Sequence, residues 1–250
     1  MSERTLPGSQ SRMQELLVAA TIAIGAFAVG NVVLLLLVGL FELGGIQMYG
    51  RQDRLVIVGT LALQGIGFGG VALAYLYESD RGRDLLRVAV PSGRTLLAIA
   101  GGYVLLVGAY LAINVLFTVL DVPMASSDIV QTGFQNPDLL LVLIPLSILL
   151  VGPGEELLYR GVIQGRLREA VSPRYAVVMT SALFAPIHVF GLSGPTLGIV
   201  AMLATVFFLS LFLGALYEYT GNLVVPALVH GLYNATQFVF AYLQATGTLA

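Results

Sequence analysis

The sequence has no cysteine, no tryptophan and no lysine, and only two of its 250 residues are histidine. The absence of cysteine excludes disulfides, thiolate catalysis and zinc sites built on cysteine. Charged residues make up only 10% of the chain, whereas hydrophobic residues make up 57%. A soluble domain contains about 25% charged residues. The composition therefore predicts a polytopic membrane protein, and the net charge of −2 gives no indication of nucleic-acid binding.

Long apolar runs predict an all-α fold, a polytopic membrane helix bundle with about seven to eight transmembrane helices. The first run is longer than the apolar core of a cleaved signal peptide, which has about 7–15 residues, so we interpret it as a membrane helix. The expected spans are about 16–41, 55–77, 95–120, 139–167, 175–190, 197–217 and 223–243. We find no internal repeat or linker. Residues 1–138 (N-terminal transmembrane helices) and 139–250 (the helices that carry the motifs below) are therefore interpreted as one continuous membrane domain.

The basic residues, all of them arginine, orient the chain. Arginines expected on the same side as the N-terminus are Arg4, Arg12, Arg81, Arg83, Arg87, Arg94, Arg166, Arg168 and Arg174. Only Arg51 and Arg54 are expected on the other side. Because basic residues accumulate in cytoplasmic loops, we expect a multi-pass protein of the cell membrane with its N-terminus in the cytoplasm.

The stretch 152–161 places Glu155, Glu156 and Arg160 directly after the apolar run 139–151. That run is too short to span a bilayer alone, so we expect the fourth helix to continue through Glu155 to about Leu167. An ionisable residue within the membrane is energetically costly and marks a candidate functional site. The alternative is that these charges flank a helix at the membrane surface.

Depth argues against a surface flank. At 1.5 Å per helical residue, Glu155 lies about 16 Å from the cytoplasmic loop, His188 about 21 Å and His230 about 12 Å. The hydrocarbon core is about 30 Å thick, so these groups fall well inside it. His230 and Asn234 are four residues apart and share one helical face. Polar groups from three helices are thus expected to meet within the membrane.

Three motifs carry a family resemblance: Glu-Glu-x-x-x-Arg at 155–160, Phe-x-x-x-His at 184–188 and His-x-x-x-Asn at 230–234. In type, order and placement on separate late helices, they resemble the motifs of the CPBP family. This family contains CAAX prenyl proteases and bacteriocin-processing, Abi-like intramembrane proteases. The resemblance covers about 139–243, and the first three spans carry no motif. Tyr159 stands where many relatives have phenylalanine.

The resemblance implies an intramembrane endopeptidase that acts on a membrane-associated or prenylated, CAAX-like protein or peptide. Its partners would then be the lipid bilayer and that substrate, with no nucleic acid. Peptide hydrolysis needs an activated water and a stabilised oxyanion. We expect Glu155 to be the general base, His188 to hold and polarise the water, and His230 with Asn234 to bind the oxyanion.

Glu156 is expected to have a structural role. It is turned about 100° from Glu155 on a helix, so it should face away from the histidines. It also precedes Arg160 by four residues, a favourable spacing for an ion pair. We therefore expect Glu156 and Arg160 to support the site by pairing with each other.

Several alternatives remain open. No cofactor is favoured, but Glu155, His188 and His230 would form a known composition for catalytic zinc. That assignment would leave no carboxylate base, because Glu156 is expected to face away. A transporter or proton relay would also use intramembrane carboxylates, although transporters often contain internal repeats. A haem carrier with both histidines as ligands would leave the glutamates unexplained. A non-catalytic scaffold of the same family is a further alternative.

Overall fold

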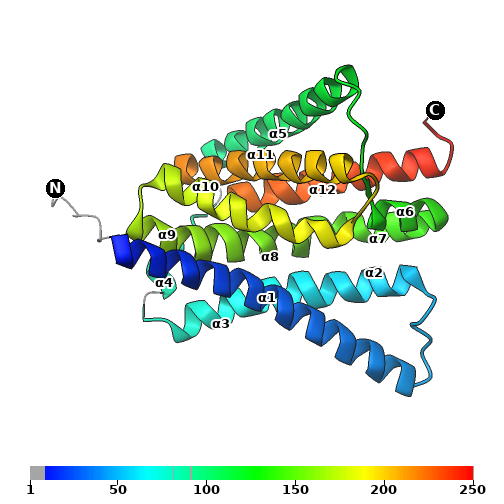
Figure 1. Ribbon diagram of the computed structural model, residues 1–250, viewed down its shortest axis with the longest axis horizontal. Helices are drawn as coiled ribbons and strands as arrows, with labels where there is room; N and C mark the ends of the chain where they lie inside the picture. The colour runs from blue at the N-terminus through cyan, green and yellow to red at the C-terminus, as the bar shows by residue number, and fades with distance from the viewer. Residues whose placement is uncertain (1–8, 81, 91, 250) are drawn as a thin grey trace.

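The computed structural model describes residues 9–80, 82–90 and 92–249. Its helices lie roughly side by side along one axis (Figure 1). Five continuous helical segments are long and apolar enough to cross a membrane: Arg12–Leu43, Gln52–Glu78, Gly93–Val119, Pro137–Ala170 and Thr196–Thr220. Two further helical rods, 173–191 and 224–245, complete the bundle. The all-α, polytopic membrane fold is confirmed, and the count of seven to eight membrane spans stays a prediction.

The N-terminal half forms three of these rods and a short connecting helix. The first rod is α1 (Ser9–Leu43), and the second is built from α2 (Gln52–Thr60), η1 (Leu61–Gly70) and α3 (Val71–Glu78). The connection contains α4 (Gly82–Leu85), and the third rod is α5 (Gly93–Val119). The middle part of the second rod, η1, is a π-helix, a wide turn type that often occurs at functional sites.

The fourth rod carries the paired glutamates and continues through them, as expected. Its consecutive segments are α7 (Pro137–Leu146), η2 (Ser147–Val151), α8 (Gly152–Glu156), η3 (Leu157–Gln164) and α9 (Gly165–Ala170). Pro145 and Pro153 lack the N–H that an α-helix needs and would disturb the regular bonding pattern. The π-helical segments η2 and η3 lie on either side of Pro153, and the rod stays continuous through them.

The remaining elements lie around this rod. They are α6 (Asp128–Gln135), α10 (Pro173–Phe184), η4 (Ala185–Gly191), α11 (Thr196–Thr220), α12 (Val224–Ala245) and two short strands, β1 (Ser126–Ser127) and β2 (Leu192–Ser193). The strands pair antiparallel, with Ser126 opposite Ser193. The expected loop between the third and fourth spans therefore contains a helix and a strand.

Close contact between the fourth rod and α12 positions the site. A Cβ at Gly152 would lie 2.4 Å from the Ala227 carbonyl oxygen, and one at Gly231 would lie 2.7 Å from the Ser147 carbonyl oxygen. The two glycines therefore allow the helix backbones to touch, as small residues do between membrane helices. As a result, the paired glutamates lie beside His230.

Large apolar side chains cover much of the outer surface. Leu35 is 71% exposed, Leu97 74% and Leu149 75%. Such extensive apolar exposure is unfavourable in water and is typical of surfaces that contact another apolar phase. The surface thus agrees with a bundle surrounded by lipid.

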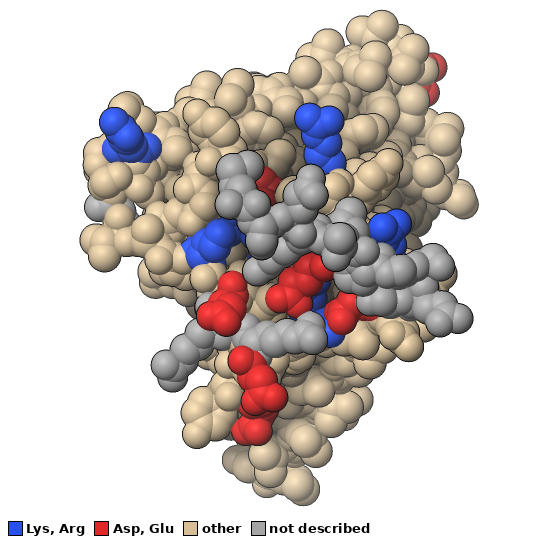
Figure 2. Space-filling model, turned by 90° about the vertical axis from the view of Figure 1, so that its left-hand side faces the viewer, with Lys and Arg blue, Asp and Glu red and all other residues tan. Residues whose placement is uncertain are grey.

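Charged side chains gather at the end that carries α4 and the α9–α10 turn (Figure 2). Glu218 lies 3.2 Å from both Arg87 and Arg168, and Arg166 pairs with Glu15 at 2.5 Å. These pairs connect the first, fourth and sixth rods and the α4 connection. Arg4 and Arg81, which also entered the orientation argument, lie outside the described residues, as does the side chain of Arg83.

Candidate active site

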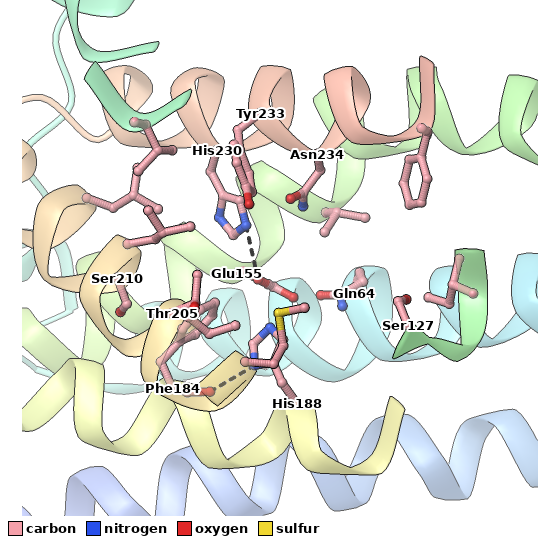
Figure 3. A pocket seen from close by; sticks show the side chains of 18 of the residues that line it. Gln64, Ser127, Glu155, Phe184, His188, Thr205, Ser210, His230, Tyr233 and Asn234 are labelled. Carbon is pink, nitrogen blue, oxygen red and sulfur yellow. Dashed lines mark hydrogen bonds and ion pairs between the residues drawn. The ribbon is translucent and has the colours of Figure 1, made fainter. Parts of the chain in front are cut away.

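A cavity of about 280 Å³ lies between the rods, and the predicted site residues line it. Glu155 reaches it from α8, His188 from η4, and His230 with Asn234 from α12 (Figure 3). The structure therefore brings all four together, although they come from three separate rods. Most of the remaining lining is apolar, which provides the low-dielectric surroundings in which polar interactions are strong.

Glu155 is the carboxylate that borders the cavity. Glu155 is only 4% exposed. Its Oε2 lies 3.6 Å from Nε2 of His230, which is longer than a normal hydrogen bond but within range of an ionic contact. The carboxyl group is therefore close to a basic ring and still directed at the cavity.

His188 has a defined proton arrangement. Its Nδ1 lies 3.1 Å from the carbonyl oxygen of Phe184, one turn earlier. A carbonyl oxygen can only accept, so Nδ1 carries a proton. In the neutral ring Nε2 is then a free acceptor. Figure 3 shows the ring inclined toward Glu155, so that acceptor can contact a molecule held between them.

Glu156 corrects one expectation, because it does not face away from the histidines. Its Oε1 lies 2.9 Å from Nδ1 of His230, while its Oε2 lies 2.8 Å from Nε of Arg160. The π-helical turns around α8 and the close approach of α12 allow this second contact. Glu156 therefore joins Arg160 and His230, and Arg160 in turn donates to Ser210 Oγ at 3.0 Å.

The hydrogen bonds of this cluster define the orientation of His230. Glu156 and Arg160 are both completely buried and form an ion pair. The carboxylate of Glu156 can only accept, so Nδ1 of His230 carries a proton. Nε2 of His230 therefore faces Glu155 and the cavity.

Phe184, the first residue of its motif, packs against the charged and aromatic groups of the site. Its ring centroid lies 4.7 Å from that of His188, 4.8 Å from Tyr159 and 6.1 Å from His230. The guanidinium carbon of Arg160 lies 5.5 Å from the same ring. This packing restricts both histidine rings and favours one orientation of each.

The N-terminal half contributes residues that the motif reasoning missed. Gln64 of η1 and Ser127 of β1 line the same cavity. A second cavity of about 450 Å³ is lined by Gln64 and Ser127 and also by Glu155 and His188. It extends to Phe27 of α1. Gln64 had a detectable signal, since it is the one amide or charged residue in the expected span 55–77.

The zinc alternative requires three ligands to converge on one point. Among the residues that the structure describes, no group of three or more histidine, cysteine, aspartate or glutamate side chains is placed to hold a metal ion. Nδ1 of His230 is engaged with Glu156, and Nδ1 of His188 with the carbonyl oxygen of Phe184. Zinc-binding histidines commonly use Nδ1 in this way and bind the metal through Nε2, so zinc remains the alternative to a metal-free mechanism.

The chain is a polytopic membrane protein with a buried carboxylate–histidine site between its helices. Residues 137–236 match a family described as Rce1-like, the type II CAAX prenyl endopeptidase Rce1-like family. This segment contains all three motifs, and the match confirms the resemblance to the CAAX protease family. The family supports a CAAX-type intramembrane endopeptidase in general. No curated protein and no solved structure matches the chain.

Proposed function

We propose that this protein hydrolyses a peptide bond within the membrane, with Glu155 as the general base. The observation that carries the proposal is the placement of Glu155 in one cavity with His188, His230 and Asn234. A buried carboxylate beside two imidazoles and an amide supplies the three functions that hydrolysis needs: proton removal, water orientation and oxyanion binding.

In the proposed reaction, Glu155 removes a proton from a water molecule held between its carboxylate and Nε2 of His188. The water oxygen bonds to the carbonyl carbon of the substrate. Glu155 then gives the proton to the leaving nitrogen as the C–N bond breaks. Water is consumed, the two products are a carboxylic acid and an amine, and Glu155 returns to its ionised form.

His230 and Asn234 stabilise the charge that develops on the carbonyl oxygen. The Nδ1–H of His230 is held by Glu156, so the ring needs its second proton to donate from Nε2. The carboxamide of Asn234 is the other donor. Donors fixed before the reaction stabilise the transition state more than the ground state, which is the basis of their effect on rate.

The substrate in this proposal is a membrane-associated or prenylated protein or peptide. The second cavity offers space for it, because it adjoins Glu155 and is lined mainly by apolar side chains from α1, η1 and η4. We place the N-terminus in the cytoplasm, on the basis of the arginine distribution. The charged end shown in Figure 2 would then face the cytoplasm.

Cleavage of a defined probe tests the proposal. Purified protein in lipid nanodiscs is mixed with a farnesylated peptide that ends in a CAAX-type sequence, and products are identified by mass spectrometry. We expect the wild type to cleave the peptide, and Glu155→Gln to fold and bind it without cleavage. Near wild-type turnover by Glu155→Gln would refute the assignment of the base. Binding without cleavage by the wild type would favour the non-catalytic scaffold.

A further inference from the structure

Gln64 lies in an unusual position for a polar side chain. It is the one amide in the ten-residue π-helical segment η1, where the other residues are apolar or glycine. A polar side chain in a membrane span is unfavourable unless it finds a partner, and it commonly marks a functional position. It also lies outside the segment 137–236 that matches the family.

Glycines on both sides hold η1 next to the site. A Cβ at Gly154 would lie 2.4 Å from the backbone oxygen of Gln64, so the residue preceding Glu155 is in direct contact with η1. On the opposite side of η1, a Cβ at Gly67 would lie 2.8 Å from the backbone oxygen of Ala26 in α1. The second rod is thus packed between α1 and α8, and the position of Gln64 relative to Glu155 is restricted.

The side chain of Gln64 points toward Glu155 (Figure 3). Its Oε1 is buried and has no hydrogen-bond partner among the described residues. An unsatisfied buried acceptor is destabilising. An ionised carboxylate cannot satisfy it, because a carboxylate and an amide oxygen both only accept. A protonated carboxyl group has an O–H and can donate.

We propose that Gln64 is a positioning residue for Glu155: its Oε1 accepts a hydrogen bond from the Glu155 carboxyl group after that group has taken a proton from the attacking water. This inference rests on the proposed function of Glu155. The proton moves from water to a Glu155 oxygen as the water oxygen bonds to the substrate carbonyl carbon. Gln64 holds the O–H in place until the proton passes to the leaving nitrogen, and its own amide protons do not move.

The kinetic test replaces Gln64 by an apolar residue of similar length. Gln64→Met should lower kcat about tenfold, the effect of one hydrogen bond made only after substrate binding, and change KM little. The matched control is Gln164→Met. Gln164 is a completely buried glutamine whose Oε1 is likewise unpartnered, but its Nε2 donates to Gly214 and Glu218 and it does not line the cavity. Its variant should lower Tm without changing kcat or KM.

Infrared spectroscopy provides a second measurement that needs no substrate. At acidic pH, the difference between wild type and Glu155→Gln identifies the C=O stretching band of protonated Glu155. In the Gln64→Met background the band should shift to higher frequency, as expected for an acid that has lost its hydrogen bond.

A lower kcat together with a shifted band supports the inference. An unchanged band overturns it whatever the kinetics, and so does a shifted band with unchanged kcat. If the wild type does not cleave the farnesylated probe, the proposed function fails. The band alone then decides whether Gln64 bonds the Glu155 acid.

Discussion

The Glu156–Arg160 pair allows the buried charge network to be tested quantitatively. Both side chains are 0% exposed, and Nε of Arg160 lies 2.8 Å from Oε2 of Glu156. Removing either partner leaves the other as an uncompensated buried charge. We therefore expect Glu156→Ala and Arg160→Ala each to lower the free energy of unfolding by about 3–5 kcal/mol.

The double variant should lose far less than the two single variants together. Once both charges are gone, neither remains unpaired, so the coupling energy should reach about 3 kcal/mol. For a chain of this size, 1 kcal/mol corresponds to a change in Tm of about 2–4 °C. The single variants should therefore unfold about 6–20 °C below the wild type.

Thermal unfolding in nanodiscs, followed by far-UV circular dichroism, measures these differences. The same cycle at Arg51 and Asp53 is the control. That pair is also close, at 2.9 Å, but its side chains are 44% and 22% exposed. It should show little coupling, since solvent screens it. Strict additivity at Glu156 and Arg160, or coupling as small as in the control, would refute the account of the network.

Three further predictions address the oxyanion site, metal dependence and topology. Asn234→Ala should lower kcat about 10²–10³-fold with little change in KM, in steady-state cleavage of the probe; an unchanged kcat would remove Asn234 from the oxyanion site. Activity should persist after extensive chelation. If the purified protein instead carries stoichiometric zinc, loses activity when the zinc is removed and regains it when zinc is added back, the metal alternative is favoured. Because the chain has no cysteine, single introduced cysteines can report its orientation. Tyr49 and Val90 are both exposed, and in intact cells an impermeant maleimide should label Tyr49→Cys but not Val90→Cys. The reverse labelling pattern would show the opposite orientation.

The sequence was most informative where the controlling interactions are local. Apolar runs located the helical rods, and the short run 139–151 predicted that the fourth helix continues past Pro153, as it does. The spacing of Glu156 and Arg160 likewise predicted their contact. These features depend on neighbours within one or two helical turns, and hydropathy and residue spacing describe such neighbours directly.

Contacts between rods were harder to predict because they depend on how each helix is rotated. The contact between Glu156 and His230 joins residues 74 positions apart. It exists because Gly152 and Gly231 let two backbones touch and because π-helical turns change the direction of side chains around α8. An ideal α-helix, which was assumed for the sequence, turns Glu156 away. Gln64 was missed for a related reason, since only the packing of η1 against Gly154 brings it to Glu155.

The central claim is that Glu155 activates a water molecule that attacks the peptide bond directly. A single turnover of the farnesylated probe in ¹⁸O-labelled water tests it, with the new carboxyl group analysed by mass spectrometry. The account predicts that the wild type incorporates one labelled oxygen in the first turnover and that Glu155→Gln gives no product. A first-turnover product without the label, or labelled product formed at the wild-type rate by Glu155→Gln, would contradict it.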